Sequence, residues 1–258
     1  MLFRSKITFI GPAILLVMRF SKWRDKNKMP VTAAYADRRT ISSKTVQMLV
    51  AINAVTINPD TPFILSSGWA SPIYVDCRKL ISFPILRQTI TDFGASIISR
   101  ELGFEAFDSV AGGESAGIPF AAWMAEKMML PMHYVRKNPR GLGRQAQIEG
   151  RVSEGERVLL VEDSTTDGRS KIKFCNGLRQ AGAIVDHVFV IFHHDTFPIK
   201  DYEPENQIRL HSLATCRDIL DVSRKEHCFE TKTIDALQSF LEEPLEWSKN
   251  HGGASEPI

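Results

Sequence analysis

The chain has 258 residues, of which 43% are hydrophobic and 24% are charged, so it can bury a substantial core in one large domain or two small ones. The formal net charge is only +2, so the overall charge does not indicate a nucleic-acid partner. The four cysteines lie far apart with no C-x-x-C pair, so neither a zinc site nor a disulfide framework is indicated, and a reducing cytoplasm is expected.

Residues 1–28 differ from the rest of the chain. An apolar run from Ile7 to Met18 lies between basic segments and is too short to span a bilayer, which takes about 20 apolar residues. The alternatives are an amphipathic targeting extension, a disordered tail, or an upstream extension with Met29 as the working start, and we favour the last two. The A-x-A pattern of Ala34–Ala36 lies too far from the apolar run for a signal peptide. No membrane partner is expected.

The spacing of apolar residues predicts alternating helices and strands. In the first half we expect a helix over 42–54, a hairpin over 63–76 with its turn near Gly68, and a helix over 85–101. In the second half we expect strands over 107–110, 132–135, 158–161, 185–192 and 209–213, and helices over 118–129, 170–180 and 233–241, with a polar segment without periodicity over 136–152. This alternation predicts an α/β fold with a mostly parallel sheet flanked by helices. Ligands bind beyond the carboxyl ends of strands in such sheets.

The most informative segment is Val158–Lys171. The predicted strand ends at Val161, the acids Glu162 and Asp163 follow, and a run of small and hydroxyl residues opens the next helix. Carboxylates can accept hydrogen bonds from ribose hydroxyls, while loop N–H groups and a helix N-terminus favour a phosphate. The segment is no P-loop, because it lacks the G-x-x-x-x-G-K-[ST] pattern. An ordinary βα turn is the alternative, but the residue types favour a site for a phosphorylated sugar.

A second segment, Arg136–Arg144, places four cations among Pro139, Gly141 and Gly143. The loop is too long to be a mere connector. Its charge suits the neutralisation of an anionic leaving group. A solvated basic loop is the alternative interpretation.

Together these segments resemble the type I phosphoribosyltransferases, and among them the orotate phosphoribosyltransferases. The acidic pair and the loop after it resemble the family's PRPP-binding motif. Three further segments occur in the family's order and spacing: Phe63–Gly68 with Ser71, Pro72 and Tyr74; Ala111–Pro119; and Tyr134–Lys137. The similarity covers most of the chain from about Ser42 to Gly253. We therefore expect an N-terminal extension (1–40), a phosphoribosyltransferase domain (41–253) and a C-terminal tail (254–258).

The resemblance implies a type I phosphoribosyltransferase fold with a small N-terminal hood. The reaction it implies transfers the 5-phosphoribosyl group from PRPP to orotate, giving orotidine 5′-monophosphate and pyrophosphate, in de novo pyrimidine biosynthesis. Mg²⁺ is the expected cofactor, carried by the pyrophosphate rather than by a protein metal site. The basic loop would be a mobile lid that closes over the neighbouring subunit's active site in a homodimer.

The same resemblance assigns individual residues. Those expected to bind PRPP are Arg136, Lys137, Glu162, Asp163, Ser164, Thr165, Thr166, Asp167, Gly168, Arg169 and Ser170. Those expected to act in catalysis are Arg140, Lys137 and Asp163. Thr166 and Tyr74 are expected to contact orotate, although a plain core aromatic is an equal alternative for Tyr74.

Several positions depart from the family's pattern. Arg140 falls where many members carry a catalytic lysine, and Leu142 where many carry a histidine. Ser66 and Ala116 stand where some members place PRPP-binding lysines. Arg169 stands where a small residue is common: it is strained if the position needs a positive φ, or else its guanidinium supplements the phosphate site.

The arginine that grips the orotate carboxylate in some members has no clear counterpart here. His193–Asp195 occupies the region after the strand over 185–192. Adjacent histidines on a strand point to opposite faces, so we do not expect a metal site there.

Two other functions remain as alternatives. A purine or pyrimidine salvage transferase would use the same scaffold, and a non-catalytic PRPP sensor would keep the sugar site without turnover. The changes at Arg140 and Leu142 allow the sensor. The basic lid argues against it, because a sensor has no leaving group to neutralise.

Overall fold

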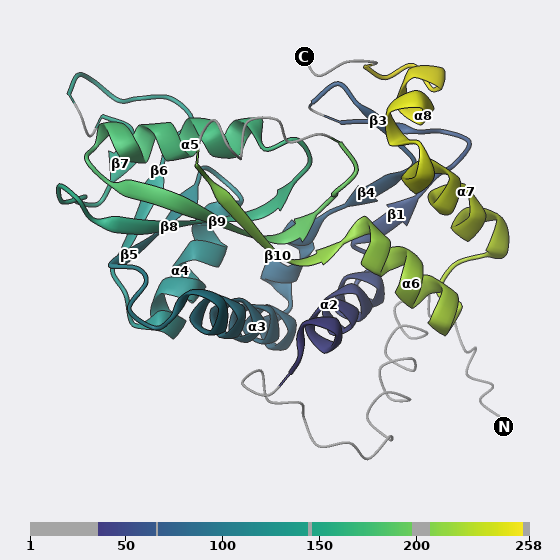
Figure 1. Ribbon diagram of the computed structural model, residues 1–258, viewed down its shortest axis with the longest axis horizontal. Coiled ribbons are helices and arrows are strands. Elements are labelled where there is room, and N and C mark those ends of the chain that lie inside the picture. The colour runs from purple at the N-terminus through teal and green to yellow at the C-terminus, as the bar shows by residue number, and fades with distance from the viewer. Residues whose placement is uncertain (1–35, 66, 144–145, 198–206, 255–258) are drawn as a thin grey trace, which may run out of the picture.

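The computed structural model describes residues 36–65, 67–143, 146–197 and 207–254. Ser66, Arg144, and most of the predicted N-terminal extension and C-terminal tail therefore lie outside the described residues. Figure 1 shows a central sheet with helices on both faces and a smaller region of short strands and helices at one end. Within the described ranges, no helix combines the length and apolar character needed to cross a membrane.

Six strands form the central sheet in the order β10-β9-β8-β5-β6-β7. They are β5 (Ser109–Gly113), β6 (Met132–Val135), β7 (Ile148–Glu149), β8 (Arg157–Thr165), β9 (Ile184–His193) and β10 (Arg209–Thr215). Neighbours are parallel throughout, apart from the antiparallel pair β6–β7 at one edge. The predicted mostly parallel sheet is confirmed.

Helices cover both faces of this sheet, as a mostly parallel sheet requires. The helices are α2 (Arg38–Ala51), η1 (Cys77–Ser82), α3 (Pro84–Leu102), α4 (Gly117–Met128), α5 (Arg169–Gln180), α6 (Cys216–Glu226), α7 (Thr231–Glu242) and α8 (Pro244–Asn250). On one face, α5 buries Phe174 and Leu178 against the apolar side chains of β8 and β9. On the other face, α3 and α4 pack with Phe189 and Ile191 in the larger core.

Four short strands form the hood. They are β1 (Val55–Ile57), β2 (Phe63–Ile64), β3 (Ala70–Ser71) and β4 (Ile73–Val75). The predicted hairpin is only partly right: β2 pairs with β3 around a turn at Gly68, whose φ is 86°, but β4 pairs with β1 instead. Pro72 separates the two pairings because it has no N–H to continue a ladder, and its carbonyl accepts from the Asn58 N–H at 2.7 Å.

Strand order fixes where a ligand can bind. The chain passes from β5 to β6 on one side, then places β8, β9 and β10 on the other side of β5. The connections therefore run in opposite directions from β5 and β8, and ligands of such sheets bind outside the carboxyl ends of strands at this kind of reversal. In the strand order β8 and β5 are the third and fourth of six strands, so they lie in the middle of the sheet.

Two strand boundaries were predicted wrongly, and both corrections matter for the site. β5 continues through the two glycines, because Gly112 and Gly113 pair with Tyr134 and Val135 of β6. β8 does not end at Val161 but runs to Thr165, since its ladder with β9 persists that far. The acidic pair therefore lies within a strand, where its backbone is fixed.

Other elements were missed because they are short or lack apolar periodicity. These are β1, β7, η1, α6 and α8. A signal for α6 was present: Thr215 and Asp218 form a capping box, with reciprocal side-chain to backbone bonds at the helix start. The helix α2 begins at Arg38, three residues before the start that we predicted for the domain.

Candidate active site

The acidic pair lies near the carboxyl end of β8, and its two members differ sharply in environment. Asp163 is partly exposed, and its Oδ1 accepts a hydrogen bond from the Ser164 N–H at 2.8 Å. The Glu162 side chain is only 6% exposed, and its Oε2 lies 2.8 Å from Nζ of Lys171 on α5. Burial raises the pKa of Glu162 to about 7 despite the lysine.

Glycines on two other elements enclose Glu162. A β-carbon on Gly113 would lie 2.7 Å from Glu162 Oε1, and a β-carbon on Gly117 would collide with the same oxygen. At Gly112, a β-carbon would lie 2.8 Å from the Gly117 carbonyl oxygen. The glycines of the segment Ala111–Pro119 thus allow β5 and the start of α4 to approach the acidic residue. The Glu114–Ser115 peptide bond in this segment is cis.

The loop after the acidic pair connects β8 to α5 as predicted. Thr165 is buried and pairs with His193, while Thr166 and Asp167 are partly exposed. Gly168 takes the left-handed conformation, with φ of 79°, and α5 begins at the next residue without a side-chain cap. The Arg169 N–H donates to Asp167 Oδ1 at 3.3 Å, so an acidic side chain lies at a helix N-terminus that otherwise suits a phosphate.

Arg169 is not strained, because the positive φ falls on Gly168. Its Nε lies 2.5 Å from Oδ2 of Asp167, and its Nη2 donates to the Ser67 carbonyl at 2.9 Å. The guanidinium thus offsets an acidic charge inside the loop and links the loop to the hood. The alternative that made Arg169 strained is therefore wrong, and a contribution of its guanidinium to the phosphate site stays a prediction.

The basic segment forms the connection of the antiparallel pair β6–β7. Tyr134 pairs with Glu149, and the Arg136 N–H donates to the Gln147 carbonyl at 2.8 Å. The Arg136 guanidinium turns to Glu149, with Nη2 at 2.5 Å from Oε1. In this structure the Arg136 side chain is therefore paired with Glu149, at the point where the basic segment leaves β6.

The remaining cations of the lid are more accessible. Lys137 and Arg140 are exposed, and the Leu142 side chain is completely so. The Lys137 backbone N–H donates to Oε2 of Glu114 at 2.8 Å, which connects the lid to the loop after β5. Arg144 lies outside the described residues.

Tyr74 lies on β4 and is 37% exposed, so the alternative that made it a core aromatic is wrong. Its ring centroid is 5.5 Å from that of Phe63. Its hydroxyl accepts from Arg78 Nη2 at 3.0 Å, and Arg78 Nε also bonds Asp76 Oδ1 at 2.7 Å. The hydrogen bond and charge of Asp76 raise the pKa of the Arg78 guanidinium, with smaller contributions from Tyr74 and Asp163.

The chain's C-terminal part also contacts the hood, and sequence reasoning missed this. Ser248 Oγ accepts from the Ala70 N–H at 3.0 Å and donates to the Ala254 carbonyl at 2.8 Å. The Ala254 N–H in turn donates to the Gly68 carbonyl at 2.8 Å. The turn between β2 and β3 is therefore held by α8 on one side and by Arg169 on the other.

The segment His193–Asp195 begins at the last residue of β9. The pKa of His194 falls to about 4, mainly through burial, and its Nδ1 lies 3.8 Å from Cys216 Sγ. Burial also lowers the pKa of His193. No group of three metal-ligating side chains occurs among the described residues, here or elsewhere.

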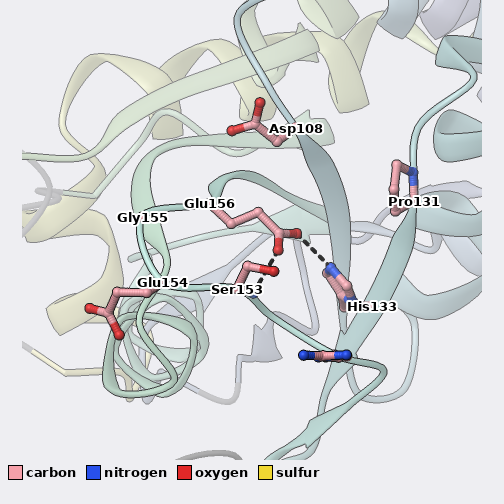
Figure 2. Close-up of a pocket in the computed structure, with 8 residues that line it drawn as sticks. Asp108, Pro131, His133, Ser153, Glu154, Gly155 and Glu156 are labelled. Atoms are coloured by element: carbon pink, nitrogen blue, oxygen red, sulfur yellow. Dashed lines mark hydrogen bonds and ion pairs between the residues drawn. The ribbon is translucent and has the colours of Figure 1, made fainter.

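A groove of about 480 Å³ lies at the opposite end of the sheet. Its lining residues Asp108, Pro131 and Glu156 directly precede β5, β6 and β8, at the amino ends of the parallel strands. Figure 2 shows Glu156 bridging Ser153 and His133 in this groove. Ligands of such sheets bind at the carboxyl ends, so the acidic pair and its loop are the better candidate.

Known proteins resemble this chain in sequence and in structure, although no family model matches it. The orotate phosphoribosyltransferase of Rhizobium rhizogenes is 48% identical over 223 residues, which cover 86% of this chain and 96% of that relative. An orotate phosphoribosyltransferase from Aeropyrum pernix superimposes with a TM-score of 0.60 and 28% identity, over 72% of this chain and 99% of the other. Leishmania donovani UMP synthase gives a TM-score of 0.67 and 25% identity, over 80% of this chain and 43% of the other.

Proposed function

The chain belongs to the orotate phosphoribosyltransferase family, and we propose that the carboxyl ends of β5 and β8 form its active site. The reaction transfers the 5-phosphoribosyl group from PRPP to orotate, giving orotidine 5′-monophosphate and pyrophosphate, in pyrimidine biosynthesis. The observation that carries the site assignment is the acidic pair followed by the N-terminus of α5, at the carboxyl end of β8 beside β5.

In the proposed complex, Glu162 and Asp163 accept hydrogen bonds from the ribose hydroxyls. The segment Ser164–Ser170 surrounds the 5′-phosphate, and the N-terminus of α5 favours its charge. Orotate lies beside Thr166 and Tyr74, so that a ring nitrogen faces the ribose C1. The bond from C1 to that nitrogen forms as the nitrogen gives up its proton to water. The bond from C1 to the pyrophosphate oxygen breaks, and pyrophosphate leaves with the electron pair of the broken bond.

The lid neutralises the charge that gathers on the leaving pyrophosphate. Lys137 and Arg140 are exposed in this structure and can move toward the ligand. Arg136 would have to exchange Glu149 for a phosphate oxygen, a change that lid closure can provide. Electrostatic stabilisation of this kind, together with orientation of the two substrates, supplies most of the catalysis.

Mg²⁺ is proposed to enter with PRPP. Among the described residues no cluster offers three metal ligands, and Mg²⁺ commonly binds through substrate phosphates with one or two protein carboxylates. When bound, Mg²⁺ would offset negative charge on the pyrophosphate.

We further propose a homodimer located in the cytoplasm, in which each lid closes over the neighbouring active site. Large apolar side chains are exposed at Ile85, Phe104 and Met129, at the ends of α3 and α4. Exposed apolar side chains of this size are compatible with a subunit interface. The exposed Leu142 places a further apolar group on the lid itself.

One assay tests the function directly. Purified protein is supplied with orotate, PRPP and Mg²⁺, and pyrophosphate release is measured together with orotidine 5′-monophosphate. Turnover with orotate, and none with purines or uracil, is expected. Turnover with another base instead would support a salvage transferase. PRPP binding without turnover would support the non-catalytic sensor.

A further inference from the structure

Lys171 is a buried cation to which the sequence analysis gave no role. It lies in the first turn of α5, and its side chain is 8% exposed. Its Nζ is 2.8 Å from Glu162 Oε2 and 3.3 Å from Ser170 Oγ. Lysine is almost never fully buried unless it is paired, so this lysine and Glu162 depend on each other.

The other oxygen of the same carboxylate is differently placed. Glu162 Oε1 is buried and makes no hydrogen bond of normal geometry among the described residues, although the Gly117 N–H lies close enough to favour the charged form. A β-carbon on Gly113 or Gly117 would lie within 2.7 Å of this oxygen, so Oε1 keeps its position only because both residues are glycine. The carboxylate therefore has one oxygen held by Lys171 and one without a partner.

We propose that Lys171 is a positioning residue for PRPP, which holds Glu162 as a carboxylate in one orientation and leaves Oε1 to accept a hydrogen bond from a ribose hydroxyl. The inference rests on the proposed function, since it assumes that Glu162 faces the ribose. Hydrogen bonds to an ionised acceptor are roughly twice as strong as neutral ones. Without Lys171, a carboxylate this deeply buried would become protonated.

Three groups act on the charge of Glu162. Lys171 favours the carboxylate, Asp163 opposes it through like charge, and the Gly117 N–H favours it. Burial opposes it more than any of these, and the pKa is about 7. PRPP binding should therefore weaken as the pH falls through this value and Glu162 gains a proton.

The test is the pH dependence of kcat/KM for PRPP between pH 6 and 9, with saturating orotate and Mg²⁺. Lys171→Arg should keep the wild-type profile. Lys171→Met should move the acidic limb upward by about one pH unit or more, which lowers kcat/KM about tenfold on the acidic side. Lys173→Met, on the exposed side of the same helix, is the matched control and should leave the profile unchanged.

A double variant that lacks both charges controls for misfolding of Lys171→Met. In a Glu162→Gln background the acidic limb due to Glu162 should be lost, and adding Lys171→Met should change kcat/KM for PRPP less than threefold. A further loss of tenfold or more in the double variant would show that Lys171 contacts PRPP itself and would overturn the proposal. So would a folded Lys171→Met variant with a wild-type pH profile. Wild-type protein without turnover would instead refute the proposed function.

A second, independent observation concerns the orotate carboxylate. Arg78 Nη2 donates at 3.0 Å to the hydroxyl of Tyr74, the residue expected beside orotate. Arg78 is 55% exposed at its side chain, and the bonds to Tyr74 and Asp76 use two of its five N–H donors. We infer that Arg78 binds the carboxylate of the acceptor base and so determines base specificity.

This inference also rests on the proposed function. It predicts that a change at Arg78 affects the KM for orotate and not the KM for PRPP. Arg78→Gln should raise the KM for orotate about tenfold or more and leave the KM for PRPP within a factor of two. Arg78→Lys should restore part of the loss, because it keeps the charge but not the planar fork. Arg157→Gln, at the amino end of β8, is the control. Equal increases in both KM values, or no increase for orotate, would overturn the role of Arg78.

Discussion

At the scale of single residues, the lid carries its charge in an unusual form. Arg140 is exposed, and its backbone N–H donates to the Ala146 carbonyl at 2.7 Å, so the residue is tied to the lid's own structure. An arginine keeps the charge of a lysine but spreads it over a rigid plane. Leu142 beside it has no polar group. Lys137 and Arg140 are therefore the exposed cations of the described part of this segment.

Arg140→Lys should preserve or raise kcat, because the compact ammonium can follow the leaving group more closely. Arg140→Ala should lower kcat by about 10²–10³, the usual effect of removing one stabilising donor. Steady-state kinetics with both substrates saturating measures both variants. A large drop for Arg140→Lys would contradict the prediction.

A second prediction at this scale concerns the glycines that surround Glu162. Gly117→Ala places a β-carbon against Glu162 Oε1 and 2.5 Å from the Val161 carbonyl oxygen. Alanine normally stabilises a helix by about 1 kcal/mol relative to glycine, but overpacking here should cost about 1–3 kcal/mol or more. We expect a net loss in the free energy of unfolding and a higher KM for PRPP.

Gly177→Ala is the matched control for this prediction. It is also a helical glycine, and its β-carbon would lie 2.9 Å from the flexible end of Gln147. Gln147 can move, so this variant should stay close to wild type in urea denaturation. Equal behaviour of the two alanine variants would argue against the enclosure of Glu162.

At the scale of secondary-structure elements, the amino ends of the central strands are joined by one carboxylate. Glu156 precedes β8, and its Oε1 accepts from Ser109 Oγ of β5 at 2.5 Å and lies 2.8 Å from His133 Nε2 of β6. Its Oε2 accepts from the Ser153 N–H at 2.7 Å. Burial acts to raise the pKa of Glu156, but these hydrogen bonds outweigh it and the pKa is lowered.

Glu156→Gln should lower the free energy of unfolding at pH 7 by about 1–3 kcal/mol, the usual contribution of hydrogen bonds to a charged group. A carboxyl with a lowered folded-state pKa stabilises the fold above its unfolded pKa and loses that contribution as the pH falls through the folded value. The difference from wild type should therefore shrink below pH 4.5. Urea unfolding at several pH values measures it.

The exposed pair of Asp108 and Arg157 provides the control at the same end of the sheet. Both side chains are nearly half exposed, so Asp108→Asn should have a smaller effect than Glu156→Gln. If the Glu156→Gln difference stays constant from pH 7 to pH 3, the carboxylate does not join the strands in the way described.

At the scale of the whole molecule, strand order brings together segments that are distant in the sequence. The glycines of β5, the acids of β8 and the start of α5 meet at the carboxyl ends of these strands, and the hood reaches the same place through Arg169. The lid emerges from the opposite side of β5, between β6 and β7. A lid at this edge of the sheet is well placed to extend toward a second subunit.

The shared lid predicts complementation between two inactive variants. Arg140→Ala disables the lid and Asp163→Asn disables the sugar site. If lids act between subunits, random mixing of the two variants in one dimer population should restore roughly a quarter of wild-type activity. Each mixed dimer then holds one intact site, which combines one subunit's lid with the other's acids. Light scattering checks the oligomeric state, and no recovery in confirmed mixed dimers would show that the lid acts within its own subunit.

Local sequence patterns were sufficient for much of the fold. Runs such as Val158–Val161 and Val185–Phe192 are apolar throughout, as expected for strands covered on both faces. They predicted the parallel sheet, and the residues after them predicted the phosphate loop. The missed elements depend on partners far away in the chain: β1 exists because β4 pairs with it, and β7 because β6 does.

The sequence by itself determined the fold class, the phosphoribosyl motif and the basic segment. Each of them depends on contiguous residues, through the spacing of apolar side chains or through a run of charged ones. Only the tertiary structure decided how those residues are used. It placed Arg169 against Asp167 and the hood, engaged Arg136 with Glu149, and gave Glu162 a buried lysine. Lys171, Phe174 and Leu178 share one helical face, and a lysine in that apolar face was the available signal. What that lysine contacts depends on the packing of α5 against β8, which no local pattern specifies.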